Sequence, residues 1–173
     1  MSVVLRRRLA GFLLAAAIFA IDQAVKWYVL FGLELRHRGQ QLELLPFFDL
    51  TRENNYGVSL GLLSARSMEM HYLLVALTGG IALFVAVWML REKAMGDIAA
   101  LAMVLGGALG NIRDRWEYGY VIDYADLHFG DFRPFLIFNF ADAAITIGVL
   151  IILARSLLSR ERPKAEAETA PES

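Results

Sequence analysis

The stretch from Tyr72 to Leu90 reads YLLVALTGGIALFVAVWML and contains no charged side chain. A helix of about 20 apolar residues is long enough to cross the ~30 Å hydrocarbon core of a bilayer. Arg91 follows directly and marks the end of the stretch at the membrane surface. This segment therefore predicts a transmembrane helix and places the chain among integral membrane proteins.

Three further apolar stretches accompany this segment. The first covers about residues 9–30, the third about residues 96–112, and the fourth about residues 135–155. The first has a basic start, which is also typical of a cleaved signal peptide, but apolar sequence continues and three more stretches follow. We therefore expect four transmembrane helices, with long outer loops at about residues 31–71 and 113–134.

The composition of the whole chain agrees with a small membrane protein. Of its 173 residues 57% are hydrophobic and 20% charged, whereas soluble domains contain about half and about a quarter. The net charge of −1 gives no basic field that would attract nucleic acid, and no cysteine is present for thiolate chemistry or disulfides. We expect residues 1–158 to form one membrane domain and residues 159–173 to be a disordered cytoplasmic tail.

The positive charges indicate the orientation. Arg6, Arg7 and Arg8 precede the first stretch, and the positive-inside rule places such a cluster in the cytoplasm. With four spans, both termini are then cytoplasmic and the long loops lie outside. The alternation in Gln41–Leu44 and the turn-like sequence Asn54–Gly57 predict a small β element on the outer surface.

Polar side chains interrupt the apolar stretches, although such residues are costly in a membrane and usually functional. They are Asp22, Lys26, Asn111, Asn139 and Asp142. With a rise of ~1.5 Å per helical residue, Asp22, Asn111 and Asp142 each lie roughly 18–21 Å from the cytoplasmic ends of their spans. The three share one layer in the outer part of the bilayer, which scattered substitutions would not produce.

The acids of this layer differ in their sequence surroundings. Asp22 and Lys26 are four residues apart and can pair on one helix face, so we expect them to support the site rather than react. Asp142 has no basic residue near it in its own span. Its partner is expected to be Asp123, which lies in the apolar, β-like run Tyr120–Tyr124 of the second outer loop. Other acids of that loop compete for this role: Asp114, Glu117, Asp126 and Asp131.

Two carboxyl groups within hydrogen-bond range share a proton, because ionising both is costly. The ionised group activates water as a general base, and the protonated group polarises a scissile carbonyl. The sequence has no His-Glu-x-x-His zinc motif, glycine-framed serine or cysteine nucleophile, so other peptidase chemistries fit poorly. The alternatives are a small proton- or cation-coupled transporter that uses Asp142 and Asp22, and a non-enzymatic assembly factor.

Five blocks in order along the chain carry a family pattern. They are Asp22-Gln23-Ala24-Val25-Lys26, Asn55-Tyr56-Gly57, Gly106 to Arg115, Gly119 to Tyr124 and Phe138 to Ile145. In these blocks the sequence resembles lipoprotein signal peptidase (signal peptidase II), a family of bacterial aspartic peptidases. The resemblance implies cleavage of diacylglyceryl-modified prolipoproteins, N-terminal to the lipidated cysteine, at the outer face of the bacterial cytoplasmic (inner) membrane.

The resemblance also implies roles for individual residues. Asp123 and Asp142 would be catalytic, Asn55, Asn111, Arg115 and Asn139 would position the substrate or the catalytic pair, and Asp22 and Lys26 would support the site. It implies no metal and no organic cofactor. The expected partners are lipid-modified prolipoproteins and membrane lipids, with no nucleic acid, and we expect a monomer.

Two departures from the family pattern bear on substrate preference rather than on reaction type. Val58-Ser59-Leu60 follows Gly57, where the family usually has small residues and then Phe. Leu136 stands two residues before Phe138, where the family commonly has Pro. We expect the first change to alter how the outer β element contacts the lipopeptide. We expect the second to alter the angle at which the chain enters the last span.

Overall fold

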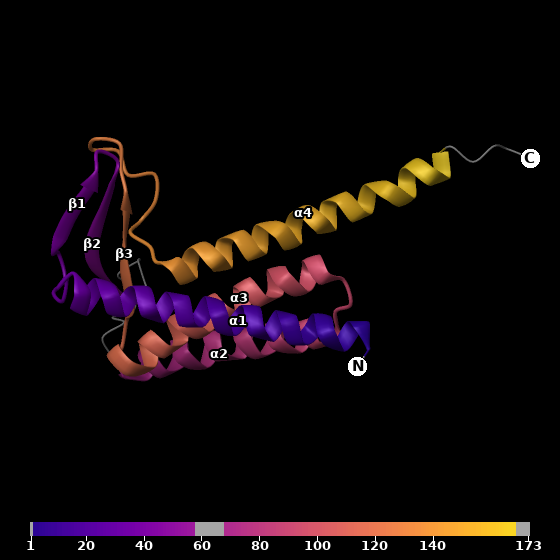
Figure 1. Cartoon of the computed structure of the whole chain (residues 1–173), viewed down its shortest axis with the longest axis horizontal. Helices are drawn as coiled ribbons and strands as arrows, with labels where there is room; N and C mark the ends of the chain where they lie inside the picture. Colours follow the sequence, from indigo (N-terminus) through magenta and orange to yellow (C-terminus); the bar gives the residue numbers. More distant parts are fainter. Residues whose placement is uncertain (1, 58–67, 169–173) are drawn as a thin grey trace, which may run out of the picture.

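Four long helices and a small sheet make up the chain in a computed structural model, which describes residues 2–57 and 68–168. The helices are α1 (Val3–Trp27), α2 (Met68–Arg91), α3 (Met95–Tyr118) and α4 (Phe140–Glu168). Among the described residues, four helical segments are long and apolar enough to cross a membrane. The sheet lies at one end of the bundle, called the sheet end below, and α4 diverges from the other helices away from that end (Figure 1).

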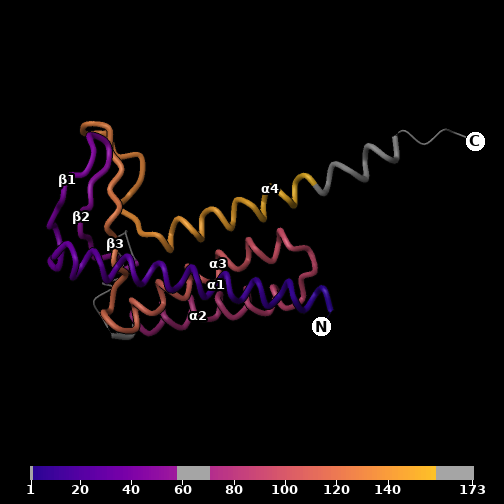
Figure 2. The backbone as a smooth tube through the Cα atoms, in the orientation of Figure 1, coloured from indigo at the N-terminus to yellow at the C-terminus, as the bar shows by residue number. Residues whose placement is uncertain are grey.

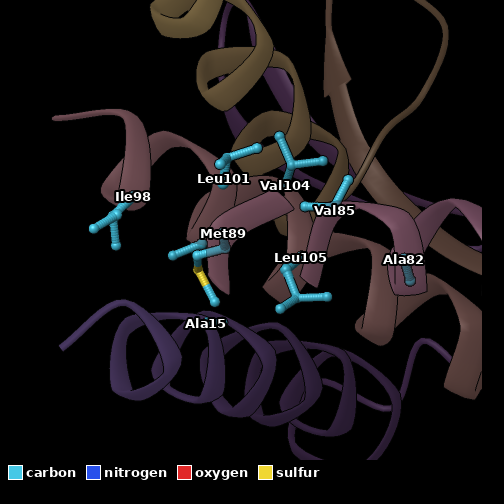
Figure 3. Packing of buried hydrophobic residues seen from close by; sticks show 9 residues of the cluster. Ala15, Ala82, Val85, Met89, Ile98, Leu101, Val104 and Leu105 are labelled. Atoms are coloured by element: carbon cyan, nitrogen blue, oxygen red, sulfur yellow. The ribbon is translucent and has the colours of Figure 1, made fainter. Parts of the chain in front are cut away.

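Helix α3 occupies the centre of the bundle and packs against each of the other three helices. Leu101 and Leu105 of α3 and Met89 of α2 belong to the same buried cluster as Ala15 of α1. Met89 and Leu105 point toward α1 beside Ala15 (Figure 3). Because these contacts bury the faces of α3, the lipid-facing apolar surface lies mainly on the outer helices, as at Leu13 of α1.

Two glycines of α3 allow its neighbours to approach very closely. A Cβ atom on Gly106 would lie 2.5 Å from the carbonyl oxygen of Ala15, and one on Gly107 would lie 2.5 Å from that of Ala141. Small residues at helix contacts are the usual means of close packing in membranes. These contacts bring the polar residues near the sheet end of α1, α3 and α4 within reach of one another.

The sheet contains three antiparallel strands in the order β1-β2-β3: β1 (Gln41–Leu45), β2 (Phe48–Asn55) and β3 (Val121–Leu127). A short π-helical segment, Tyr28–Gly32, continues α1 toward the sheet. The structure therefore confirms the predicted all-α membrane protein with a small β element. It also shows that the second outer loop supplies one of the strands.

The ends of two helices differ from the predicted spans. Helix α3 continues to Tyr118, so residues 113–118, which we expected in the outer loop, are helical. It ends at Gly119, which adopts a left-handed conformation and whose N–H binds the Arg115 carbonyl. Helix α4 begins at Phe140 instead of near residue 135, because Pro134 and the extended residues after it precede the helix.

Helix α4 also continues into the predicted tail, as far as Glu168. Residues 159–168 contain Glu, Lys, Arg and Ala, which favour helix, and also Pro163, which does not. The disordered cytoplasmic tail stays a prediction. Residues 169–173 lie outside the described residues. The departure at Val58-Ser59-Leu60 also falls outside them.

Candidate active site

A buried ion network joins α1 to α3 near the sheet end. The Lys26 Nζ atom lies 2.8 Å from an Asp22 carboxylate oxygen and 2.7 Å from Asp114 Oδ2. All three side chains are at most 2% exposed. Gln23 donates hydrogen bonds to Asp22 (3.0 Å) and Asp114 (3.1 Å). We call Asp22, Lys26 and Asp114 the lysine network, in which each buried charge has an opposite charge beside it, as burial requires.

The lysine network leads to Asp142 through one amide. Lys26 Nζ donates to Asn111 Oδ1 at 3.2 Å, and Asn111 Nδ2 donates to Asp142 Oδ1 at 2.8 Å. An ammonium group has only donors, so the Asn111 oxygen must face Lys26 and its NH₂ group must face Asp142. The orientation of this amide is therefore set by the charge of Lys26.

Asp142 lies in the first turn of α4, where it takes part in a reciprocal cap with Asn139. The Asp142 N–H donates to Asn139 Oδ1 at 2.9 Å, and the Asn139 N–H donates to Asp142 Oδ2 at 3.2 Å. This is the pairing of a capping box, with Asn139 as N-cap and the acid three residues later. Asp22 of α1 accepts a further hydrogen bond from the Ala141 N–H (3.1 Å), so α1 also holds the start of α4.

Asp123 reaches the same place from β3. Its side chain is 2% exposed, and Asn139 Nδ2 donates to Asp123 Oδ1 at 2.7 Å. Asn139 thus contacts both carboxyl groups: its side-chain NH₂ donates to Asp123, and its backbone N–H donates to Asp142. Burial and the nearby charge of Asp142 raise the pKa of Asp123 to about 7, against hydrogen bonds from Asn55 and Asn139 that favour its ionised form.

A cleft of about 600 Å³ opens beside Asp123. Residues 53–57, at the end of β2, form one wall, and residues 133–137, before α4, form the other. Asn55 is held in place because its side-chain oxygen accepts the Gly57 N–H at 2.8 Å. The cleft therefore has a fixed amide on one side and the exposed apolar side chains of Phe135 and Leu136 on the other.

Arg115 lies close to the cleft and to both aspartates. A Cβ atom on Gly57 would be 3.6 Å from an Arg115 guanidinium nitrogen, and the Arg115 charge interacts with those of Asp142 and Asp123. Within the described part of the chain, the buried Arg115 Nε atom has no hydrogen-bond partner. Arg115 thus brings positive charge and a donor to a site that otherwise contains carboxylates and amides.

The four other acids considered as partners of Asp142 bind elsewhere or lie outside the site. Asp114 belongs to the lysine network, Asp126 binds Arg133 at 3.1 Å, and Glu117 pairs with Arg113 at 2.8 Å. Asp131 is exposed in the loop after β3. By contrast, Asp123 and Asp142 are joined through Asn139, as described above.

Two residues at or near the site were not predicted to have a role. Gln23 bridges Asp22 and Asp114, and its place in the Asp-Gln-x-x-Lys block was the available signal. Arg52 of β2 is 2% exposed and lies over the Tyr120 ring, 5.4 Å from its centroid. Nothing in the sequence around Arg52 distinguishes it from an ordinary strand residue facing water.

The described residues thus combine four membrane spans with two aspartates, Asp123 and Asp142, that Asn139 joins. Residues 14–158 match the family described as signal peptidase (SPase) II. The chain belongs to this signal peptidase II family and is a multi-pass protein of the bacterial inner membrane. These comparisons give no support to the transporter that the sequence left open.

Relatives and solved structures cover nearly the whole chain. The lipoprotein signal peptidase of Sphingopyxis alaskensis is 52% identical, over 93% of this chain and 92% of the relative. That of Rhizorhabdus wittichii is 54% identical, over 91% of each chain. Two solved bacterial membrane enzymes share the fold. The first has a TM-score of 0.70 at 24% sequence identity and covers 95% of this chain and 93% of its own. The second has a TM-score of 0.72 at 27% sequence identity and covers 86% of this chain and 92% of its own.

Proposed function

We propose that Asp123 and Asp142 are the catalytic pair with which this peptidase cleaves diacylglyceryl-modified prolipoproteins, N-terminal to the lipidated cysteine. The observation that carries the proposal is the Asn139 bridge, with 2.7 Å to Asp123 and 3.2 Å to Asp142. Among the described residues, Asp22, Asp114, Glu117 and Asp126 each have a basic ion-pair partner and Asp131 is exposed. The bridge joins the two remaining acids, and one of them, Asp123, lines the cleft.

The pair has the properties that hydrolysis of a peptide bond requires. One carboxylate takes a proton from water as the water oxygen attacks the scissile carbonyl carbon, and the other carboxyl group protonates the carbonyl oxygen. Burial of Asp123 favours a single negative charge on the pair, because it raises the pKa of Asp123 to about 7. Both protonation states that the reaction needs are then present near neutral pH.

The cleft and Arg115 position the substrate in this proposal. Asn55 lines the cleft, and Arg115 has an Nε atom without a hydrogen-bond partner among the described residues. Both side chains supply donors for the backbone carbonyls of an extended peptide. Phe135 and Leu136 are 61% and 82% exposed on the opposite wall, where they suit a substrate with acyl chains. Asp22 and Lys26 act indirectly, because they hold Asn111 and the start of α4 in place.

The orientation in the membrane is also part of the proposal: both termini are cytoplasmic and the site faces outward. Arg7 donates to the Lys93 carbonyl and Arg8 to that of Glu92, so the first arginines meet the basic turn between α2 and α3. The N-terminus lies at the end of the bundle remote from the sheet (Figure 2). Positive charge thus gathers at the end opposite the aspartates, which the positive-inside rule assigns to the cytoplasm. We expect the protein to act as a monomer.

The test is cleavage of a purified diacylglyceryl prolipoprotein by the reconstituted enzyme. Asp123→Asn and Asp142→Asn should each abolish cleavage while the protein still inserts and unfolds at a temperature close to that of the unmodified chain. Asp131→Asn, a change of an exposed acid in the same loop, should cleave normally. Normal processing by either of the first two variants would remove that residue from the catalytic role.

A further inference from the structure

We infer that, before substrate binds, the proton of the aspartate pair rests on Asp123 and the negative charge on Asp142. The inference rests on the proposed function, because it assigns the roles of acid and base within that pair. It follows from a difference between the two carboxyl groups in their exposure and in their place in the fold, because Asp142 lies in the first turn of α4 and Asp123 lies on β3.

The surroundings of Asp142 stabilise a carboxylate. Each of its oxygens accepts an N–H: Oδ1 from Asn111 at 2.8 Å and Oδ2 from the Asn139 backbone at 3.2 Å. It stands in the first turn of α4, where the aligned peptide dipoles favour negative charge. Its side chain is only half-buried, whereas Asp123 is 2% exposed. Hydrogen bonds to an ionised acceptor are stronger than those to a neutral one, and a proton on Asp142 would weaken both.

Lys26 reinforces this state from a distance. Its ammonium group holds Asn111 Oδ1 at 3.2 Å, so the Asn111 NH₂ cannot turn away from Asp142 without placing a donor against a cation. The donor to Asp142 is therefore fixed before substrate arrives. In this arrangement Lys26 is a positioning residue for the base, in addition to its ionic contacts with Asp22 and Asp114.

Asp123 is the better site for the proton. It is 2% exposed on β3, and burial raises its pKa to about 7 although Asn55 and Asn139 donate hydrogen bonds to it. The charged groups that face it come from every neighbouring element: Lys26 of α1, Glu53 of β2, Arg115 of α3 and Asp142 of α4. The Glu53 carboxylate is already bound to Arg38 at 2.6 Å, and the two cations act on Asp123 without a direct ion pair among the described contacts.

This assignment specifies which aspartate donates and which accepts a proton in each step of peptide hydrolysis. Asp142 accepts a proton from the attacking water, and Asp123 gives its proton to the carbonyl oxygen, which yields a neutral geminal diol. When the C–N bond breaks, Asp142 returns its proton to the leaving amine nitrogen. Asp123 regains a proton from the diol as the new carboxyl group forms, so the pair ends in its starting state.

The direct test is the infrared C=O stretch of protonated carboxyl groups in the reconstituted full-length protein. A band present at about pH 5, above the ordinary pKa of Asp, should disappear with a midpoint near pH 7. Asp123→Asn should abolish this band. Asp142→Asn should keep it and move its midpoint to lower pH, because the neighbouring negative charge is gone. Asp131→Asn is the control and should leave the band unchanged.

The inference is overturned if the band disappears in Asp142→Asn, or if the unmodified protein shows no such band. Either result leaves the proposed function standing as long as both asparagine variants are inactive. Normal cleavage by Asp123→Asn or Asp142→Asn would instead overturn the proposed function, and the assignment of acid and base would fall with it. Cleavage and infrared spectra therefore separate the two failures.

A second measurement does not depend on the folding of the aspartate variants. Asn111→Ala removes one donor from Asp142, so the acidic limb of the kcat/KM profile should move up by roughly one pH unit while the alkaline limb stays in place. A purely structural role for Asn111 would lower the rate at every pH without moving either limb. Movement of the alkaline limb alone, or of neither limb, would contradict the assignment.

Discussion

Two groups of acids lie close together near the sheet end of this bundle, and they differ in what surrounds them. In the lysine network, Asp22 and Asp114 share Lys26, with ionic contacts of 2.8 and 2.7 Å. Among the described residues, Asp123 and Asp142 form no direct ion pair with a cation, and Asn139 joins them. Burial alone therefore does not make an acid reactive. A neighbouring ammonium makes it structural, whereas a second carboxyl group bridged by amides leaves a proton to share.

The largest difference between the two groups should appear in activity. Asp123→Asn keeps a side-chain oxygen that can accept the Asn139 hydrogen bond, so folding should survive, while the proton for the carbonyl oxygen is lost. We expect kcat to fall by at least about 10³-fold, at the upper part of the range for acid–base groups. Single-turnover cleavage measures this fall. A variant that is inactive because it is unfolded would also lose its thermal unfolding transition. That result would contradict the expectation that Asp123→Asn folds normally and loses only activity.

The lysine network should show the opposite pattern. Lys26→Met leaves the buried carboxylates of Asp22 and Asp114 facing each other without a cation, which should cost roughly 3–5 kcal/mol of unfolding free energy. Thermal unfolding in detergent, under conditions where it is reversible, measures the loss. Unchanged thermal stability together with lost cleavage would show that the lysine network takes part in catalysis. The network and the aspartate pair would then not differ in the way described above.

The pH dependence of stability should separate Asp123 from the paired acids. The pKa of Asp123 is about 7 in the folded protein, whereas the ordinary value for Asp, 3.8, applies in the unfolded chain. The folded chain therefore binds this proton more tightly than the unfolded chain. The contribution of Asp123 to stability should therefore decline as the pH rises from about 4 to about 7. Asp123→Asn should flatten the unfolding free energy over this window. An identical slope in both proteins would show that Asp123 does not titrate there.

The smallest effect is expected at an exposed pair on the same helix as Asp114. Glu117 and Arg113 form an ion pair of 2.8 Å, with side chains 44% and 46% exposed. Such pairs contribute up to about 1 kcal/mol, so Glu117→Gln should change the unfolding free energy by no more than that. The same thermal measurement provides the control for Lys26→Met. A loss as large as that of Lys26→Met would mean that burial does not distinguish the two sites.

The four spans could be predicted because each depends on a local property, the length of an apolar run between charges. The sequence placed Asp22, Asn111 and Asp142 in one layer for the same reason, and the structure connects these three side chains through Lys26 and Asn111. Their depth in the bilayer stays a prediction. Their assigned roles stay predictions. The small β element was also recognisable from alternation in Gln41–Leu44.

What could not be predicted depends on contacts between elements. Asp114 was placed in a loop, whereas it lies one turn after Asn111 on α3 and binds Lys26. Asn139 was expected to position the pair, but its double contact, as helix cap and as bridge, requires knowing where α4 begins. The sequence of a single helix does not encode its register against the neighbouring helices, so the partner of each buried polar group has to come from the structure.

The central claim is that Asp123 and Asp142 act as one unit, and a double-mutant comparison tests it most directly. Cleavage rates of Asp123→Asn, Asp142→Asn and the double variant would be measured with the same diacylglyceryl prolipoprotein. Residues that act as a unit are not additive, so the double variant should be no slower than the slower single variant. If the double variant instead loses the product of the two single losses, the two aspartates contribute independently and the account is contradicted.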